Sequence, residues 1–254
     1  MKMTARARAV FLTALFSALI LLGVLAALLL PDRSFSENEN RYLAKFPAFT
    51  LSTVFSGKFM KEFETYVSDQ FPGRDGWVQL KAEAQRAMGK LSNNSVYYGK
   101  SGYLLQKFQE PGEQFQKNLA ALTSFLGKTE LPVSILAAPT SAHVLTQYLP
   151  SGAWGYDEGL VIEAVSQAVR DAGRGGTLFL DPTAALKAHG GEPIYFRTDH
   201  HWTMLGAYYA YAALRQAQGA TPPALSEYEK TVVSSNFLGT LYSKNQLWGQ
   251  QKDE

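Results

Sequence analysis

The sequence contains no cysteine among its 254 residues. This absence excludes disulfide bonds, zinc sites built from thiolates and a cysteine nucleophile. It is compatible with an oxidising environment outside the cytoplasm, where a free thiol would be reactive. The residues after the first 30 are numerous enough for one sizeable core, or for a core with a smaller appendage.

The sequence also lacks an excess of charge of either sign. Lysine and arginine number 24 and the acidic residues 22, which gives a formal net charge of +2. A balance of this kind gives no indication of nucleic-acid binding, and we expect no nucleic-acid partner. No motif indicates a nucleotide, a flavin or a metal, so we expect no cofactor.

Charged residues are absent from Ala9 to Leu30. A helix over this run is about 33 Å long, which matches the roughly 30 Å hydrocarbon layer of a bilayer. The run has no polar face, which disfavours a buried helix of a soluble protein. We therefore expect residues 1–30 to form a cytoplasmic tip and a single-pass transmembrane anchor.

Basic residues precede this run at Lys2, Arg6 and Arg8. Because short cytoplasmic flanks carry the excess of Lys and Arg, the expected orientation places everything after the run outside the cytoplasm. A secretory signal has a shorter apolar stretch and a small-residue cleavage site after it. Here the candidate site near Val24 and Ala26 lies inside the run. The pattern favours an uncut anchor over a cleaved signal peptide.

Residues 31–91 are expected to form a helical accessory region. Large apolar side chains recur every four residues at Phe55, Phe59, Phe63, Val67 and Phe71. This spacing predicts an amphipathic helix that ends at Pro72-Gly73, followed by a second helix from about Gly76 to Met88. The aromatic stripe is expected to pack on the main domain; the alternative is a surface for a partner or the membrane.

Residues 92–254 are expected to form an α/β domain. Val96–Leu105 predicts two short strands around Gly99–Gly102. Helices and strands then alternate, with helices expected at Glu113–Leu126 and Glu158–Asp171 and strands at Val133–Ala137 and Thr177–Leu180. Alternation of this kind predicts a parallel sheet covered by helices, with ligand sites at the carboxyl ends of its strands. The loops that become candidates are Pro139–Pro150 and the one from Asp181 onward.

The most informative local motif is Thr198–Thr203, which precedes an expected helix at Ala207–Arg215. An aspartate two residues before a histidine can hold one imidazole nitrogen and leave the other free to accept a proton from a hydroxyl nucleophile. Asp199 and His201 therefore form a candidate catalytic dyad.

Two other interpretations of this motif stay open, a structural polar cluster and a metal site. Zinc is disfavoured because adjacent histidines, here His200 and His201, point in different directions in most backbone conformations. Trp202 is expected to be a packing wall of a pocket rather than a platform for substrate.

Several segments together resemble the DHHW protein family: Phe35–Arg41, Tyr98-Gly99-Lys100, Gly102-Tyr103-Leu104, Leu149-Pro150 and Asp199-His200-His201-Trp202. That family is similar to the alginate O-acetyltransferases, whose SGNH-hydrolase-like domain carries an Asp-x-His-Trp-Thr motif. The resemblance implies an SGNH-like parallel sheet, with Asp199 as the orienting carboxylate and His201 as the general base. His200 would occupy the variable position of the motif, and Asn236 would be a polar contributor to the pocket.

The resemblance also implies a serine nucleophile in a later strand followed by Asp-Ser, and the sequence contains no Asp-Ser pair. Ser234, Ser235 and Ser243 follow the motif, but none has the strand-to-turn setting that exposes a nucleophile. We therefore expect a shortened member that lacks its last strands and is inactive as it stands.

Two classes of function remain open. One is an extracytoplasmic O-acetyltransferase or esterase that moves an acyl group from a donor to a hydroxyl of a cell-envelope polysaccharide or to water. The other is a non-catalytic envelope module that binds glycan or protein through the same cleft.

Overall fold

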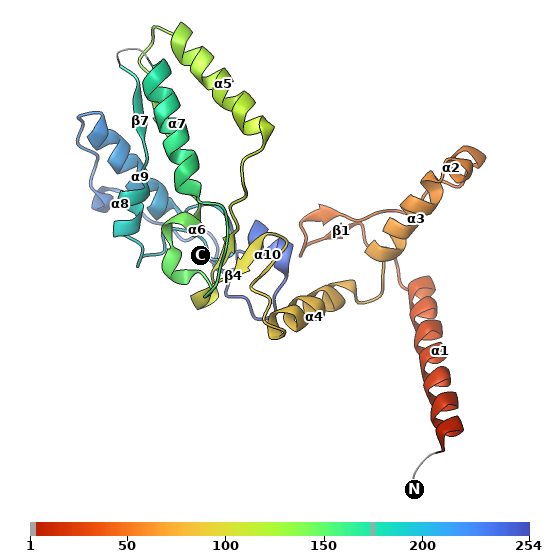
Figure 1. The fold of residues 1–254 in the computed structure, drawn as a ribbon. Helices are drawn as coiled ribbons and strands as arrows, with labels where there is room; N and C mark the ends of the chain where they lie inside the picture. The colour runs from red at the N-terminus through yellow and green to blue at the C-terminus, as the bar shows by residue number, and fades with distance from the viewer. Residues whose placement is uncertain (1–3, 174–175) are drawn as a thin grey trace. The chain divides into compact units, whose positions relative to one another are not determined.

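The computed structural model describes residues 4–173 and 176–254. Lys2, one of the three basic residues expected before the membrane span, lies outside the described residues. The chain divides into two compact units, one ending at Lys81 and the other beginning at Ala82. Figure 1 shows the elements of both units.

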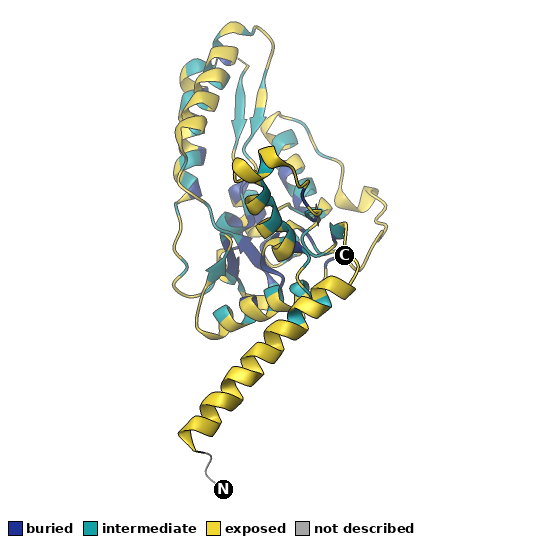
Figure 2. Cartoon of the chain, turned by 90° about the vertical axis from the view of Figure 1, so that its right-hand side faces the viewer, coloured by how far each residue is buried: buried dark blue, intermediate teal, exposed yellow. Residues whose placement is uncertain are grey.

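Helix α1 (Ala5–Leu29) is the apolar segment expected from the sequence. Its first turn is capped by Thr4, whose hydroxyl accepts a hydrogen bond from the backbone of Ala7. The helix is 25 residues long, has no buried residue and is long and apolar enough to cross a membrane. In Figure 2 this helix has the colour of exposed residues along nearly its whole length. The predicted apolar helix is therefore confirmed.

The rest of the first unit contains a short antiparallel hairpin of β1 (Phe35–Ser36) and β2 (Arg41–Tyr42). Helices α2 (Leu51–Phe55) and α3 (Lys58–Asp69) follow, and α4 (Arg74–Ala87) continues into the second unit. The prediction of one helix through Phe55 and Phe71 is wrong. Gly57 breaks it with a left-handed φ of 73°, a conformation that favours glycine.

The aromatic stripe of α3 packs on the chain that precedes α2. The ring of Phe46 lies 6.4 Å from that of Phe59 and 5.9 Å from that of Phe63, both edge to face. Phe49 makes a similar contact with Phe59 at 5.2 Å. Such edge-to-face pairs are favoured by the aromatic quadrupole and hold this segment against the helix.

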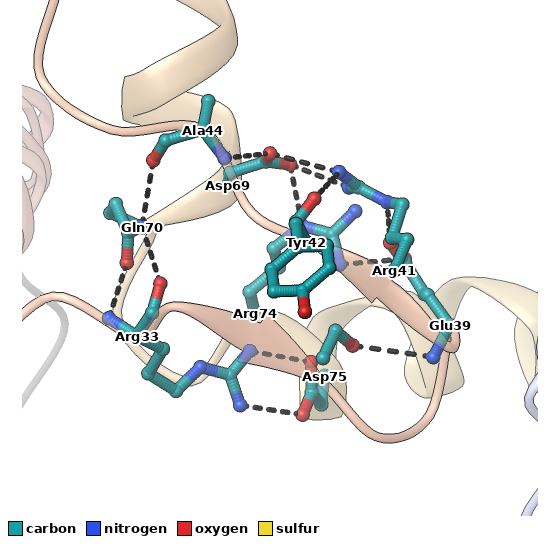
Figure 3. A network of polar contacts seen from close by, with 10 residues as sticks. Arg33, Glu39, Arg41, Tyr42, Ala44, Asp69, Gln70, Arg74 and Asp75 are labelled. Atoms are coloured by element: carbon teal, nitrogen blue, oxygen red, sulfur yellow. Dashed lines mark hydrogen bonds and ion pairs between the residues drawn. The ribbon is translucent and has the colours of Figure 1, made fainter.

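A network of ion pairs fastens the hairpin to α3 and α4 (Figure 3). The buried carboxylate of Asp69 accepts two hydrogen bonds from the Arg41 guanidinium, at 2.6 and 2.9 Å, and one from the backbone of Ala44 at 2.8 Å. Glu39 bridges Arg41 and Arg74 at 2.6 Å each. The Arg41 guanidinium lowers the pKa of Asp69. The charged residues Glu39 and Arg41 of the segment Phe35–Arg41 thus have a structural role in this network.

The second unit begins with an antiparallel sheet of β3 (Ser92–Asn93), β4 (Val96–Tyr98) and β5 (Leu104–Gln106). The 3₁₀ turn Lys100–Gly102 joins the last two strands and pairs Tyr98 with Leu104. The predicted hairpin is confirmed.

A parallel pair of strands, β6 (Ser134–Leu136) and β7 (Leu178–Leu180), forms the other sheet of this unit. Helices α5 (Glu113–Lys128) and α7 (Glu158–Ala172) precede these strands and pack against each other (Figure 1). The remaining helices are α6 (Ser141–Val144), α8 (Thr183–Ala188), α9 (Met204–Ala217) and α10 (Thr240–Asn245). The α/β class is confirmed, with small sheets in the described residues.

The main core cluster lies between the antiparallel sheet and the helices α6 and α8. Its fully buried members include Leu105, Leu145, Leu186 and Ile194, and Trp202 packs against it from the edge. The burial of such side chains supplies about 1.5–3 kcal/mol each. The segment that carries the Asp199 motif is thus fixed to the core on both sides.

Candidate functional site

The motif lies on a tight loop that leads into α9. Tyr195 and Trp202 form an isolated antiparallel bridge, and the backbone of Thr203 donates to Ile194 at 3.0 Å. Thr203 is the N-cap of α9, and its hydroxyl accepts from Gly206 at 3.3 Å. A Cβ at Gly206 would lie 2.1 Å from the carbonyl oxygen of Ile194, so the close approach of loop and helix requires glycine.

Asp199 lies at the centre of a hydrogen-bond cluster. Its Oδ1 accepts from His201 Nδ1 at 2.6 Å and from the His201 backbone at 3.0 Å. Its Oδ2 accepts from the backbone and hydroxyl of Thr240 at 2.7 and 2.9 Å. Burial by itself raises the pKa of Asp199, but these four hydrogen bonds outweigh burial and lower the pKa to about 2. Asp199 is therefore a carboxylate at neutral pH.

His201 points its free edge to solvent. Its side chain is 66% exposed, and its Nδ1 is held by Asp199. No residue that the structure describes forms a hydrogen bond with its Nε2. This is the arrangement that a general base requires, because one nitrogen is fixed by a carboxylate and the other can accept a proton.

Gly239 and Thr240 contact Asp199, although the resemblance gave a pocket role in this segment only to Asn236. A Cβ at Gly239 would lie 2.4 Å from the Cβ of Asp199, so this position must be glycine for α10 to reach the carboxylate. Gly239 and Thr240 form a Gly-Thr pair at the start of a short helix, and such a pair does not by itself predict a contact with Asp199. The partners lie 41 residues apart, which no local pattern can connect.

His200 lies beside His201 and contacts the same threonine. Its Nδ1 is 2.7 Å from the Thr240 hydroxyl, and the two imidazole centroids are 3.8 Å apart at 38°. The expectation that the two adjacent histidines point in different directions is wrong. The hydrogen bond between His200 and Thr240, which itself contacts Asp199, holds the His200 ring on the same side as His201.

One nitrogen from each histidine and one oxygen of Asp199 lie within 4.8 Å of one another, so these three residues are a set that could hold a metal ion. Both carboxylate oxygens already accept two hydrogen bonds each. A metal at Asp199 would therefore compete with the contacts that orient His201.

Within the described residues, Asn236 forms no hydrogen bond with Asp199 or His201. Its side chain is exposed and accepts a hydrogen bond from Lys252, and its backbone donates to Ser234 at 3.2 Å. Trp202 packs on the core cluster.

The serines that follow the motif make contacts other than with His201. The Ser234 hydroxyl accepts from Asn236, and the Ser243 hydroxyl donates to the carbonyl of Gly239 at 3.4 Å. Within residues 4–173 and 176–254, no hydrogen bond joins His201 to Ser234, Ser235 or Ser243. In the described residues the imidazole of His201 thus has no serine hydroxyl partner.

Asp253 accepts hydrogen bonds from the residues that directly precede Asp199. Its carboxylate accepts from the backbone of Arg197 at 2.8 Å and from the backbone and hydroxyl of Thr198 at 2.9 and 2.6 Å. The Thr198 hydroxyl in turn accepts from the backbone of Gly239 at 3.0 Å. Asp253 also pairs through its backbone with Phe237.

In a comparison with known protein families, residues 171–250 match the DHHW protein family. This range contains the whole Asp199 cluster except Asp253, and it confirms the resemblance seen in the sequence. A search of the curated proteins gave no match.

Three solved structures are similar in part. A DHHW family protein from Eubacterium siraeum is 24% identical with a TM-score of 0.47, covering 62% of this chain and 55% of its own. The O-acetyltransferase domain of Pseudomonas putida AlgJ is 25% identical with a TM-score of 0.42, with coverages of 49% and 47%. Bacillus cereus PatB1 with a sulfonyl adduct is 19% identical with a TM-score of 0.42, with coverages of 56% and 52%. The chain spans about half the length of these structures.

Proposed function

Because residues 171–250 match the DHHW family, we propose that the Asp199 cluster is the acid–base half of an acyl-transfer site, that of an O-acetyltransferase or acetylesterase. The observation that carries the proposal is the 2.6 Å contact between Asp199 Oδ1 and His201 Nδ1. It supports a fixed tautomer, with the proton on Nδ1 and a lone pair on the exposed Nε2.

In the proposed reaction, His201 Nε2 takes the proton of a serine hydroxyl as the serine oxygen attacks the carbonyl carbon of an acetyl ester. The ionised Asp199 stabilises the resulting imidazolium. The imidazolium then returns the proton to the leaving alkoxide, which leaves an acetylated serine. In the second half His201 takes a proton from a hydroxyl of an envelope polysaccharide, or from water, as the oxygen of that group attacks the acetyl carbonyl carbon. The bond between the acetyl carbon and the serine oxygen then breaks, and the imidazolium returns the proton to the serine.

The proposed location is the outer side of the cell membrane. Helix α1 is long and apolar enough to span the bilayer, and Arg6 and Arg8 lie at its N-terminal end. The bias of basic residues to the cytoplasmic side supports an orientation with the residues that follow α1 outside the cytoplasm.

The test uses a small chromogenic acetyl ester. We expect the 254-residue chain to give no turnover above background, because His201 lacks a hydroxyl nucleophile in the described structure. In a longer version that adds a strand followed by Asp-Ser, as in the family pattern, turnover should appear. His201→Ala should then remove most of it, since base and nucleophile act as a unit.

Two further variants test the same cluster, and His200→Ala is the matched control for His201→Ala. Asp199→Asn should also be severe because an amide no longer favours the required tautomer and charge. His200→Ala should be milder, and circular dichroism should show each variant folded. Near-full activity of His201→Ala with loss in His200→Ala would overturn the assignment of the base. Turnover by the unextended chain that needs His201 would identify one of its own serines as the nucleophile.

The second candidate is a non-catalytic envelope module that binds glycan or protein. It is favoured by one observation, the lack of a serine contact to His201 in the described residues. Ligand binding that does not change in His201→Ala, together with no turnover in the longer version, would select this candidate.

A further inference from the structure

The residues that directly follow α1 are held by the helices of the first unit. The backbone of Arg33 donates to Gln70 Oε1 at 2.9 Å, and Gln70 Nε2 donates to the carbonyl of Arg33 at 3.0 Å. The Arg33 guanidinium donates two hydrogen bonds to the carboxylate of Asp75, at 2.8 and 3.0 Å. Figure 3 shows these contacts of Arg33. The hydroxyl of Tyr66 donates to Asp32 at 3.0 Å. The end of α3 and the start of α4 are thus attached to the segment that leaves α1.

This attachment sets how far the two helices can lie from the apolar segment. Arg33 follows Leu30, the C-cap of α1, by three residues. An extended chain of this length spans about 10 Å at most. The polar layer of a bilayer is about 5–7 Å thick on each side of the hydrocarbon. With α1 across the bilayer, Arg33 lies in or next to the head-group layer. Gln70 and Asp75, which contact Arg33, lie within a side-chain length of the same layer.

Apolar side chains are exposed at this place. Phe71 directly follows Gln70 and is 46% exposed, and Trp77 lies two residues after Asp75 and is 58% exposed. Trp77 and Leu80 are three residues apart, so they lie on one face of α4. The exposed large apolar residues from the end of α3 to the middle of α4 are Val67, Phe71, Trp77 and Leu80, and we call them the juxtamembrane surface. Exposed apolar side chains that are gathered in this way mark a protein or membrane contact.

The lipid leaflet is the partner that this surface fits. Tryptophan is enriched at membrane interfaces, and the apolar face of an interfacial helix enters about 5–10 Å into the boundary between head groups and acyl chains. Lys81 is exposed and directly follows Leu80, so its ammonium can reach lipid phosphates. A protein partner has to compete with a leaflet that a link of three residues keeps next to the surface, which gives the lipid a high effective concentration.

We propose that the juxtamembrane surface docks on the lipid leaflet at which α1 ends, with Phe71 and Trp77 below the head groups and Lys81 at the phosphates. The proposal rests on the proposed anchoring of α1 in the membrane. The contact gives the first unit a second attachment besides the span. This unit therefore does not rotate freely about the chain at Pro31.

The experiment measures tryptophan fluorescence of the full chain in nanodiscs of phosphatidylcholine and phosphatidylglycerol. The acyl chains are brominated near the head groups, because bromine quenches an indole only on contact. Trp77 is one of four tryptophans. We expect Trp77→Phe to remove most of the quenching. Trp154→Phe is the matched control, since Trp154 is 78% exposed but is not part of the surface, and it should leave the quenching unchanged. No quenching in the wild type, or equal losses in both variants, would overturn the proposal.

A second pair of variants keeps every tryptophan. Leu80→Asp puts a charge on the surface and should lower the quenching about twofold or more, because a carboxylate resists transfer into the acyl-chain region. Leu225→Asp makes the same change at a leucine of similar exposure outside the surface and should have no effect. Circular dichroism should show all variants folded. Unchanged quenching in Leu80→Asp would contradict insertion of this face.

The number of chains in a disc separates lipid from a second copy of the chain. Quenching of Trp77 in discs that hold one chain is expected. If Trp77 is not quenched there but is shielded from a soluble quencher in discs that hold two chains, a second copy covers the surface and the lipid proposal is wrong.

The same preparation separates this proposal from the proposed location. A chain that does not enter the discs would refute the anchor, and the docking with it. A chain that enters the discs while Trp77 stays unquenched would refute the docking alone. Quenching in discs does not depend on which side of the cell membrane the chain occupies, so it supports the docking even if the proposed orientation is reversed.

Discussion

At Asp199 four hydrogen bonds converge on one buried carboxylate, two from His201 and two from Thr240. Hydrogen bonds to an ionised acceptor are about twice as strong as those between neutral groups. The side chain is therefore important both for the position of the imidazole and for the stability of the loop that carries it.

Acid unfolding should reveal this contribution. The folded pKa of about 2 lies below the ordinary 3.8. The carboxylate therefore contributes its full stability above about pH 4 and loses it as the pH falls toward 2. The difference corresponds to about 2 kcal/mol. We expect Asp199→Asn to be less stable than wild type by about this amount near pH 6, and the gap to narrow below pH 4, in denaturant titrations. A gap that is constant over this range would contradict the role of the charge.

Gly239 makes a steric prediction. In Gly239→Ala the new methyl group would lie 2.4 Å from Asp199 Cβ, so α10 or the motif loop must shift. We expect a loss of about 2 kcal/mol or more in the free energy of unfolding. The control is Gly191→Ala, because no atom lies within 4 Å of a Cβ at Gly191. That variant should stay within about 0.5 kcal/mol of wild type. Equal stability of both variants would show that the helix is not packed on the carboxylate.

At the scale of elements, the ion pairs around the β1–β2 hairpin replace the apolar core that so short an element cannot have. Asp69 is 4% exposed, and removing its charge leaves Arg41 without its bidentate partner. We expect Asp69→Asn to lower the free energy of unfolding by about 3 kcal/mol. Glu62→Gln removes an exposed pair with Lys58 at 3.6 Å and should change it by no more than about 0.5 kcal/mol. Similar effects of the two substitutions in thermal unfolding would refute a special role for the network.

The sequence predicts best the elements that have a clear apolar pattern over most of their length. Helices α5 and α7 and strands β6 and β7 lie within two residues of expectation, since apolar periodicity fixes them locally. The break at Gly57 was missed because the four-residue recurrence of aromatic side chains continues across it.

The candidate site divides in the same way. The contact between Asp199 and His201 is local and could be predicted from their spacing of two residues. Thr240 and Asp253 reach the motif from 41 and 55 residues away, through the fold of α10 and the segment after it. No periodicity or spacing in the sequence encodes such contacts.

For the whole molecule, the orientation in the membrane decides where any chemistry takes place. A reporter fused after Glu254 should be active only if it functions outside the cytoplasm, because α1 carries its basic residues at the N-terminal end. High-salt washing should leave the protein in the membrane fraction if α1 is uncut. A cytoplasm-only reporter signal would reverse the topology, and soluble protein with a new N-terminus near Ala27 would show cleavage.

The hydrogen bonds of Thr198 join three stretches of chain that are distant in sequence, those around Asp199, Gly239 and Asp253. Opening any one of these stretches breaks at least one hydrogen bond of the buried Thr198 hydroxyl. Their backbone amides should therefore exchange with deuterium as one cooperative unit, with a common opening free energy. The orientation of the His201 imidazole then depends on this small cooperative unit. A substitution at Asp253 should therefore accelerate amide exchange at Thr240.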